Sequence, residues 1–174
     1  METKKYTRLS LLIALSVVLN LIESMIPIFN GFIPGLKLGL ANIITLFVLY
    51  LYSFKDSIYV SIVRVLLVGI LRTGLFSITF FFSLGGALLS VIMMNLFKKI
   101  SKLSIIGISI IGSIFHSLGQ ILIAIIFIKN MNMIYYLPWL LLFSIPTGII
   151  TGIIAKELMK YFKNYWLINQ KNIY

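Results

Sequence analysis

The stretch SIIGISIIGSIFHSLGQILIAIIFI, residues 104–128, decides the fold. It contains no Asp, Glu, Lys or Arg. Its length suits an α-helix that crosses a bilayer, which needs about 20 mainly apolar residues. Five further apolar stretches accompany it, at about 9–28, 36–52, 57–72, 78–97 and 137–161. The sequence therefore predicts an all-α, polytopic membrane protein with six transmembrane helices.

Composition supports a protein that lies almost wholly in the membrane. Hydrophobic residues make up 60% of the 174 residues, and six spans with short loops use nearly the whole chain. We therefore expect a single integral membrane domain over 1–174. The net charge of +11 flanks apolar segments and forms no basic face on a soluble element, so we expect contact with lipid headgroups and no nucleic acid.

The distribution of Lys and Arg predicts the orientation. Cytoplasmic loops of membrane proteins are enriched in these residues. Eleven of the fifteen fall at one set of helix ends: Lys4, Lys5, Arg8, Lys55, Lys98, Lys99, Lys102, Lys156, Lys160, Lys163 and Lys171. Both termini are therefore predicted to be cytoplasmic, in a multi-pass protein of the plasma membrane.

Polar side chains inside the predicted spans are the candidates for function. An ionisable group in hydrocarbon costs about 2.5 kcal/mol or more on insertion scales, so it normally faces the bundle interior or water. Most of these groups fall in the predicted outer half of the membrane, as a pocket that opens outward requires. The predicted substrate-binding residues are Glu23, Lys37, Asn42, Arg64, Arg72, Ser83, His116 and Gln120.

Several of these residues have an equally plain structural explanation. Lys37 and Arg72 are also placed to extend toward lipid headgroups. Glu23 is equally suited to pair with a buried basic residue. Asn42 and Ser83 are more typical of hydrogen bonds that join packed helices. These alternatives predict polar groups that pair with one another and leave no room for a ligand.

His116 and Gln120 are four residues apart, hence on one helix face, and form the strongest functional pair. A hydrogen bond between helices is the competing interpretation. A lone His with no nearby Cys, Asp or Glu makes a poor metal site, and the Gly-rich stretches lack the Lys-Ser/Thr of a phosphate-binding loop. We therefore expect no catalytic residues, no metal and no cofactor.

Small residues indicate how the helices pack. Gly148 and Gly152 form a GxxxG pattern in the last span, and such patterns let helix backbones approach closely in lipid. Packing within the chain is favoured over an interface with a partner.

Several motifs resemble those of a bacterial membrane family. The most specific is PGLKLGLAN, residues 34–42; weaker ones are Glu23-Ser24, the run at 64–67, SLGG at 83–86 and HSLGQ at 116–120. Together they cover about residues 9–160. The family is known both as heptaprenyl diphosphate synthase component I and as the Gx transporter family.

The resemblance implies a fold similar to the S components of energy-coupling factor (ECF) transporters, six-helix proteins that bind small molecules near the outer face. An ECF coupling subunit and two ATPases would then be partners. S components commonly carry Ala-xxx-Ala on the first helix, whereas here Val18 follows Ala14, and Ser10-xxx-Ala14 is the nearest substitute.

The two family names imply different functions. Prenyl diphosphate synthases hold substrate through Mg²⁺ on Asp-rich motifs, and this chain has one Asp, Asp56, so it is not expected to be an enzyme. We favour a substrate-binding subunit for uptake of a small, anionic or polar molecule. The alternative is a non-catalytic component of heptaprenyl diphosphate synthase with a soluble synthase partner. A third hypothesis is a structural subunit with no ligand.

Overall fold

All secondary structure in the described part of the chain is helical, which confirms the all-α part of the predicted fold class. The computed structural model describes residues 2–25 and 39–171, and side chains over 3–25 and 39–162. The elements are α1 (Glu2–Met25), α2 (Leu40–Leu51), α3 (Phe54–Val68), the π-helical turn η1 (Gly69–Thr73), α4 (Ile78–Ile100), α5 (Ile105–Ile128), the 3-10 turn η2 (Met131–Tyr136) and α6 (Leu137–Lys171).

Serine residues begin three of the helices. The side chains of Ser53, Ser77 and Ser104 precede α3, α4 and α5, and each accepts a hydrogen bond from a backbone N–H in the first turn. This bond satisfies a donor that has no partner within the helix. At Ser53 the cap is reciprocal, because Asp56 accepts from the Ser53 backbone N–H at 3.2 Å. Local chemistry therefore sets these boundaries close to the predicted ones.

Among the described residues, four helical segments are long and apolar enough to cross a membrane: Thr3–Met25, Ile78–Ile100, Ile105–Ile128 and Met131–Phe162. Helices of this length and apolar composition are typical of membrane proteins. α2 is apolar but has only 12 residues, about 18 Å at the helical rise, against about 30 Å of hydrocarbon. α3 has 15 residues before it continues as η1. The six-span topology therefore stays a prediction.

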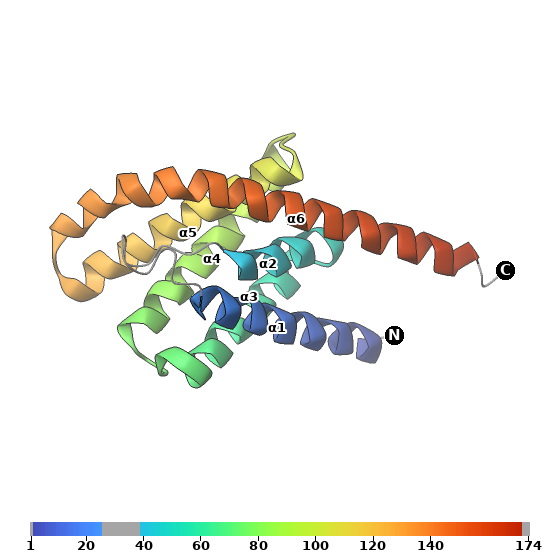
Figure 1. The fold of residues 1–174 in the computed structure, drawn as a ribbon, viewed down its shortest axis with the longest axis horizontal. Coiled ribbons are helices and arrows are strands. Elements are labelled where there is room, and N and C mark those ends of the chain that lie inside the picture. The colour runs from blue at the N-terminus through green and yellow to red at the C-terminus, as the bar shows by residue number, and fades with distance from the viewer. Residues whose placement is uncertain (1, 26–38, 172–174) are drawn as a thin grey trace.

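Two helices extend further than the sequence predicts. α1 begins at Glu2 instead of about residue 9, and α6 continues to Lys171 instead of ending near 161. Hydropathy marks where apolar residues stop, whereas a helix continues as long as its backbone hydrogen bonds do. The polar ends of α1 and α6 therefore project beyond the apolar segments, at the same end of the molecule (Figure 1).

The short helix α2 lies in the core. Eight of its residues are buried, and Leu46, Phe47 and Leu49 pack with Met94 of α4 and Ile108 of α5. The end of α2 near residue 49 is held by a cation from α4. Lys98 Nζ donates to the Leu49 carbonyl at 2.7 Å and lies 4.4 Å from the centroid of the Tyr50 ring. A cation is favourable there because the carbonyls at a helix C-terminus carry partial negative charge.

Glycines bring α4, α5 and α6 into close contact. A Cβ on Gly119 of α5 would lie 2.6 Å from the Gly85 carbonyl oxygen of α4. Cβ atoms on Gly148 and Gly152 of α6 would lie 2.7 and 2.9 Å from Cα atoms of α5. The GxxxG pattern therefore packs within the chain, which confirms that prediction.

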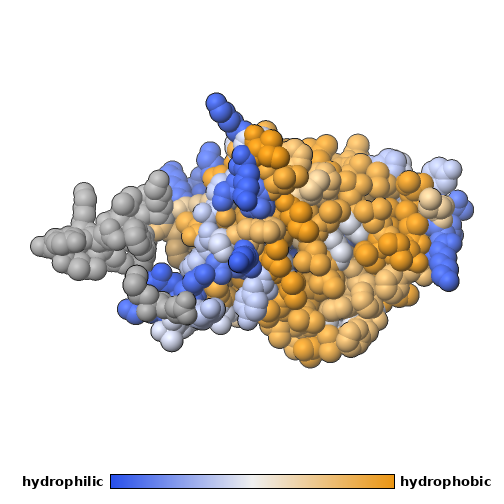
Figure 2. All heavy atoms as spheres, turned by 180° about the vertical axis from the view of Figure 1, so that it is seen from behind, coloured by the Kyte–Doolittle hydropathy of each residue, from blue (hydrophilic) through white to orange (hydrophobic). Residues whose placement is uncertain are grey.

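The outer surface fits a lipid environment. Hydrophobic atoms cover the middle of the molecule, and hydrophilic atoms gather toward its ends (Figure 2). Large apolar side chains such as Leu11, Ile126 and Leu142 are more than 60% exposed, which is unfavourable in water but not in hydrocarbon. Near the termini, Lys5 Nζ and Asp56 Oδ1 form an ion pair of 2.8 Å between α1 and α3. The assignment of that end to the cytoplasm stays a prediction.

Candidate functional site

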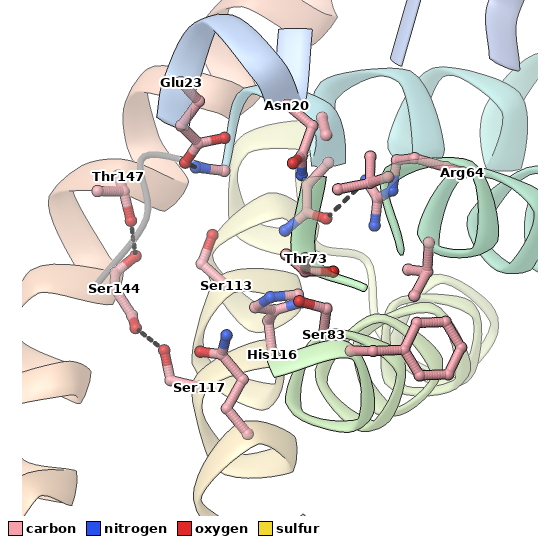
Figure 3. Close-up of a pocket in the computed structure, with 17 residues that line it drawn as sticks. Asn20, Glu23, Arg64, Thr73, Ser83, Ser113, His116, Ser117, Ser144 and Thr147 are labelled. Carbon is pink, nitrogen blue, oxygen red and sulfur yellow. Dashed lines mark hydrogen bonds between the residues drawn. The ribbon is translucent and has the colours of Figure 1, made fainter. Parts of the chain in front are cut away.

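A polar-lined cavity lies among the helices (Figure 3). Its walls come from the end of α1, the start of α2, the second half of α3, the start of α4, the middle of α5 and the early turns of α6. The cavity holds about 40 Å³. Because one water needs about 10–15 Å³ on this measure, there is room for a few waters or for a small polar group.

Glu23 joins α1 to the start of α2. Its side chain is 8% exposed. Its two carboxylate oxygens accept hydrogen bonds from the backbone N–H groups of Gly39, at 2.6 Å, and Leu40, at 3.1 Å. Gly39 precedes α2 with a φ of 78°, a left-handed conformation that glycine adopts without strain. A carboxylate at this place is stabilised by the partial positive charge of a helix N-terminus.

Arg64 is the buried cation of the cavity. It lies on α3, is 3% exposed, and its Nη1 donates to Asn42 Oδ1 of α2 at 3.4 Å. Within the described residues its Nε has no hydrogen-bond partner, and no carboxylate forms an ion pair with it. Glu23 attracts it electrostatically. A guanidinium has five N–H donors, so Arg64 retains capacity for an anionic group.

One face of α5 supplies the floor of the cavity. Ser113, His116, Ser117 and Gln120 all line it, and their spacing of three, four and seven residues puts them on the same face. Gly86 of α4 packs directly on this face, because its Cβ would lie 2.8 Å from the His116 carbonyl oxygen. The close approach of α4 to α5 is what brings His116 beside the cavity.

The hydroxyl groups of α6 form the opposite wall. Ser144 Oγ donates to the Leu140 carbonyl at 2.6 Å, and lies 2.7 Å from Ser117 Oγ. Thr147 Oγ1 donates to the Phe143 carbonyl at 3.0 Å. Because these protons are used by the helix itself, the two oxygens keep only acceptor capacity, and Ser144 Oγ accepts from Ser117.

A family model described as heptaprenyl diphosphate synthase component I matches residues 12–158. The chain belongs to the heptaprenyl diphosphate synthase component I family. The match confirms the family resemblance seen in the sequence motifs. No curated protein and no solved structure gave a match to this chain.

In this member of the component I family, the described parts of the motifs surround the cavity. Gly39 and Asn42, from the PGLKLGLAN segment, start α2 and line the cavity. The SLGG and HSLGQ motifs form the crossing of α4 and α5, where a Cβ on Gly119 would also lie 2.9 Å from Gly86 Cα. The motifs therefore serve two purposes, namely close helix packing and the placement of polar groups.

The structure brings together six of the eight predicted site residues. Those that line the cavity are Glu23, Asn42, Arg64, Ser83, His116 and Gln120. Arg72 does not line it and is exposed at the end of η1. Lys37 lies outside the described residues. Ligand binding by these residues stays a prediction.

Sequence reasoning missed six polar lining residues. They are Asn20, Thr73, Ser113, Ser117, Ser144 and Thr147. Helical spacing contains a usable signal, because Asn20 is three residues before Glu23 and Ser113 is three before His116. Ser144 and Thr147 show the same spacing on α6. Thr73 gives no such signal, since it lies in a π-helical turn.

Proposed function

We propose that this protein is a membrane-embedded subunit that captures a small anionic or strongly polar molecule in its cavity and passes it inward with partner subunits. One observation carries the proposal: Arg64 is a buried cation, facing a polar cavity, whose Nε lacks a hydrogen-bond partner among the described residues. A buried guanidinium with an unused N–H donor is suited to a ligand that carries an acceptor or a negative charge.

The cavity also supports binding over a purely structural role. The structural hypothesis predicts that intramembrane polar groups pair with one another and leave no space. Ser117 and Ser144 do pair, at 2.7 Å, and so do Ser109 and Thr151, at 2.9 Å. The residues around Arg64 instead leave a cavity, and among the described residues Arg64 Nε has no hydrogen-bond partner.

The proposal places the cavity mouth at the outer face, and the absence of cysteine from the sequence makes this testable. Ser113→Cys would put a single thiol in the cavity lining. A membrane-impermeant thiol reagent is expected to modify it in right-side-out vesicles and not in inside-out vesicles. Ser101→Cys, at the far end of α4, is the matched control and is expected to react with the opposite sidedness. Modification of Ser113→Cys only from the inner face would overturn capture from outside.

The second candidate function is a non-catalytic membrane partner of a prenyl diphosphate synthase. The family name favours it, since it describes a component of that enzyme. Catalysis by this chain alone is not proposed, because the Mg²⁺-binding Asp-rich motifs of such enzymes have no counterpart in a chain with one Asp.

A gentle-detergent pull-down of the tagged chain from its native membrane separates the two candidates. Co-purification of two ATPases and a coupling membrane protein would support uptake. Co-purification of a soluble prenyl synthase subunit would instead support the second function and overturn the first.

A further inference from the structure

The cavity is bounded by two groups of helices that are packed in different ways. In the first group, α4, α5 and α6 approach one another through glycines. A Cβ on Gly86 of α4 would lie 2.8 Å from a backbone oxygen of α5, and a Cβ on Gly148 of α6 would lie 2.7 Å from a Cα atom of α5. Helix backbones this close pack tightly in lipid and leave little freedom to shift. We call α4–α6 the glycine-packed unit.

The second group consists of α1, α2 and α3, whose helical residues include no glycine. Polar side chains join these helices instead. Glu23 of α1 accepts from the start of α2, and Arg64 of α3 donates to Asn42 of α2. Thr45 Oγ1 of α2 also lies 3.3 Å from Ser61 Oγ of α3. Hydrogen bonds of this kind hold membrane helices together, and we call α1–α3 the hydrogen-bonded unit.

The two units are tied to each other at two places. Leu49 of α2 belongs to one apolar cluster with Met94 of α4, and Lys98 Nζ of α4 donates to the Leu49 carbonyl. On the side where α3 faces α4, Val65 of α3 packs in a cluster with Phe80 of α4. Both places therefore hold the units together through α2 and α3.

The edge between α1 and α6 is different, because these two helices do not pack on each other. Both line the cavity, with Asn20 and Glu23 from α1 and Ser144 and Thr147 from α6 (Figure 3). Within these described helices, no Cα atom of α1 lies within 8 Å of a Cα atom of α6. Directly packed helices, whose axes are about 8–10 Å apart, bring Cα atoms closer than this. Each of the two walls is therefore held by its own unit.

The segment that connects the two units has the features of a hinge. α3 ends in the π-helical turn η1, and Gly74 follows it with a φ of 82°. Phe76 also has a left-handed φ, of 63°. Hinges are commonly a few residues at the ends of helices that absorb changes in backbone angles. π-Helical turns are frequent at functional sites.

We propose that the cavity opens between α1 and α6, when the hydrogen-bonded unit turns as one body relative to the glycine-packed unit about the η1 connection. The contacts of α3 with α4, and the cluster around Leu49, are kept during this movement. The purpose of the opening, which is to admit a ligand, rests on the proposed binding function. The movement itself requires no ligand.

The test is the spread of distances between two spin labels on the full-length protein in lipid nanodiscs, measured by EPR without ligand. Because the chain has no cysteine, two engineered cysteines carry the labels. Ile22→Cys with Leu142→Cys reports on the edge between α1 and α6, and both positions are exposed. This pair is expected to give a broad distribution with a second population that is longer by more than about 2 Å, the scale of backbone rearrangements.

Three control pairs at exposed positions locate the movement. Ile22→Cys with Leu66→Cys lies within the hydrogen-bonded unit, and Leu122→Cys with Leu142→Cys lies within the glycine-packed unit. Leu66→Cys with Ile92→Cys spans the two units on the side where α3 faces α4. All three are expected to give narrow, single distributions. A distribution for the α1–α6 pair as narrow as the controls would overturn the proposal, and so would equally broad distributions for all four pairs.

Failure of this proposal is distinguishable from failure of the proposed function. A narrow distribution for the α1–α6 pair would refute the movement, while the sidedness of Ser113→Cys modification would still report on the cavity mouth. A broad distribution for that pair, together with modification of Ser113→Cys only from the inner face, would support the movement and overturn capture from outside.

Discussion

Glu23→Ala tests the junction between α1 and α2, on which the shape of the cavity depends. The carboxylate accepts from two backbone N–H groups at the start of α2, at 2.6 and 3.1 Å. Leaving such donors without an acceptor costs about 1–3 kcal/mol each when they are buried. Gly39 and Leu40 are only half-buried, so the lower half of that range applies. We expect a loss of about 2–4 kcal/mol in the free energy of unfolding.

Two further variants sharpen this measurement. Glu23→Gln retains one acceptor oxygen but loses the charge at the helix N-terminus, so a loss of about 1–2 kcal/mol is expected. Glu157→Ala removes an exposed carboxylate from α6 and should change stability by less than about 0.5 kcal/mol. Unfolding would be followed by denaturant titration of the protein in detergent. An effect of Glu23→Ala as small as that of Glu157→Ala would refute the role of Glu23 as a cap of α2.

The same carboxylate also compensates the buried charge of Arg64. Glu23→Gln combined with Arg64→Gln should therefore be less destabilising than the sum of the single changes. A coupling of about 0.5–3 kcal/mol is typical of residues in one network. Additive effects would mean that the two charges do not interact.

Three other substitutions test the packing and the ends of the bundle. Gly119→Ala should destabilise the protein by about 1–3 kcal/mol, because its Cβ would meet the Gly85 carbonyl oxygen at 2.6 Å. The control is Gly107→Ala, whose Cβ has no neighbour closer than 3.4 Å; it should leave the Tm unchanged or raise it in a thermal melt. Ser117→Ala should lower stability by about 0.6 kcal/mol, a typical value for a hydrogen bond between membrane helices; a loss above about 2 kcal/mol would contradict this. Partial burial raises the pKa of Asp56, but hydrogen bonds from Lys5 and Ser53 outweigh it and hold the pKa below its usual range. The carboxylate of Asp56 therefore adds to the free energy of unfolding above the unfolded pKa of about 3.9, and this stabilisation is lost as pH falls through the lower folded pKa. Asp56→Asn should accordingly lower the free energy of unfolding at neutral pH and have almost no effect in strong acid.

Hydropathy predicts the long helices because each contains a continuous apolar stretch, but it places the start of α1 and the end of α6 too far inward. The stretch at 104–128 forms α5 over Ile105–Ile128, and Ser104 caps it. The contacts that hold the two ends of α2 could not be predicted from hydropathy. Apolar residues suggest a span over 36–52, but they do not reveal that Glu23 holds one end of the described helix and Lys98 the other. Those contacts join residues far apart in sequence.

Site residues could be predicted from the sequence where a charged or amide side chain falls deep within a predicted membrane span, because such residues are rare there. Arg64, Glu23 and Gln120 fall in this class, and all three line the cavity. Ser144 and Thr147 do not, since small hydroxyl residues are common in packed membrane helices and their depth alone carries little information.

Arg72 shows a different limit of sequence reasoning. It lies in η1, a π-helical turn in which hydrogen bonds join residues five apart instead of four. This insertion rotates the residues that follow relative to an α-helix. The face of Arg72 could not be deduced from α-helical spacing, and the side chain is exposed outside the cavity.

Native mass spectrometry of the protein isolated from its own membrane tests the central claim, that the cavity around Arg64 binds a small molecule. The account predicts a bound small molecule on the wild-type protein and on the control Arg8→Gln, which removes an exposed arginine, and its loss from Arg64→Gln. A bound molecule that Arg64→Gln retains equally, or a wild-type protein that carries none under conditions that preserve bound lipid, would contradict it.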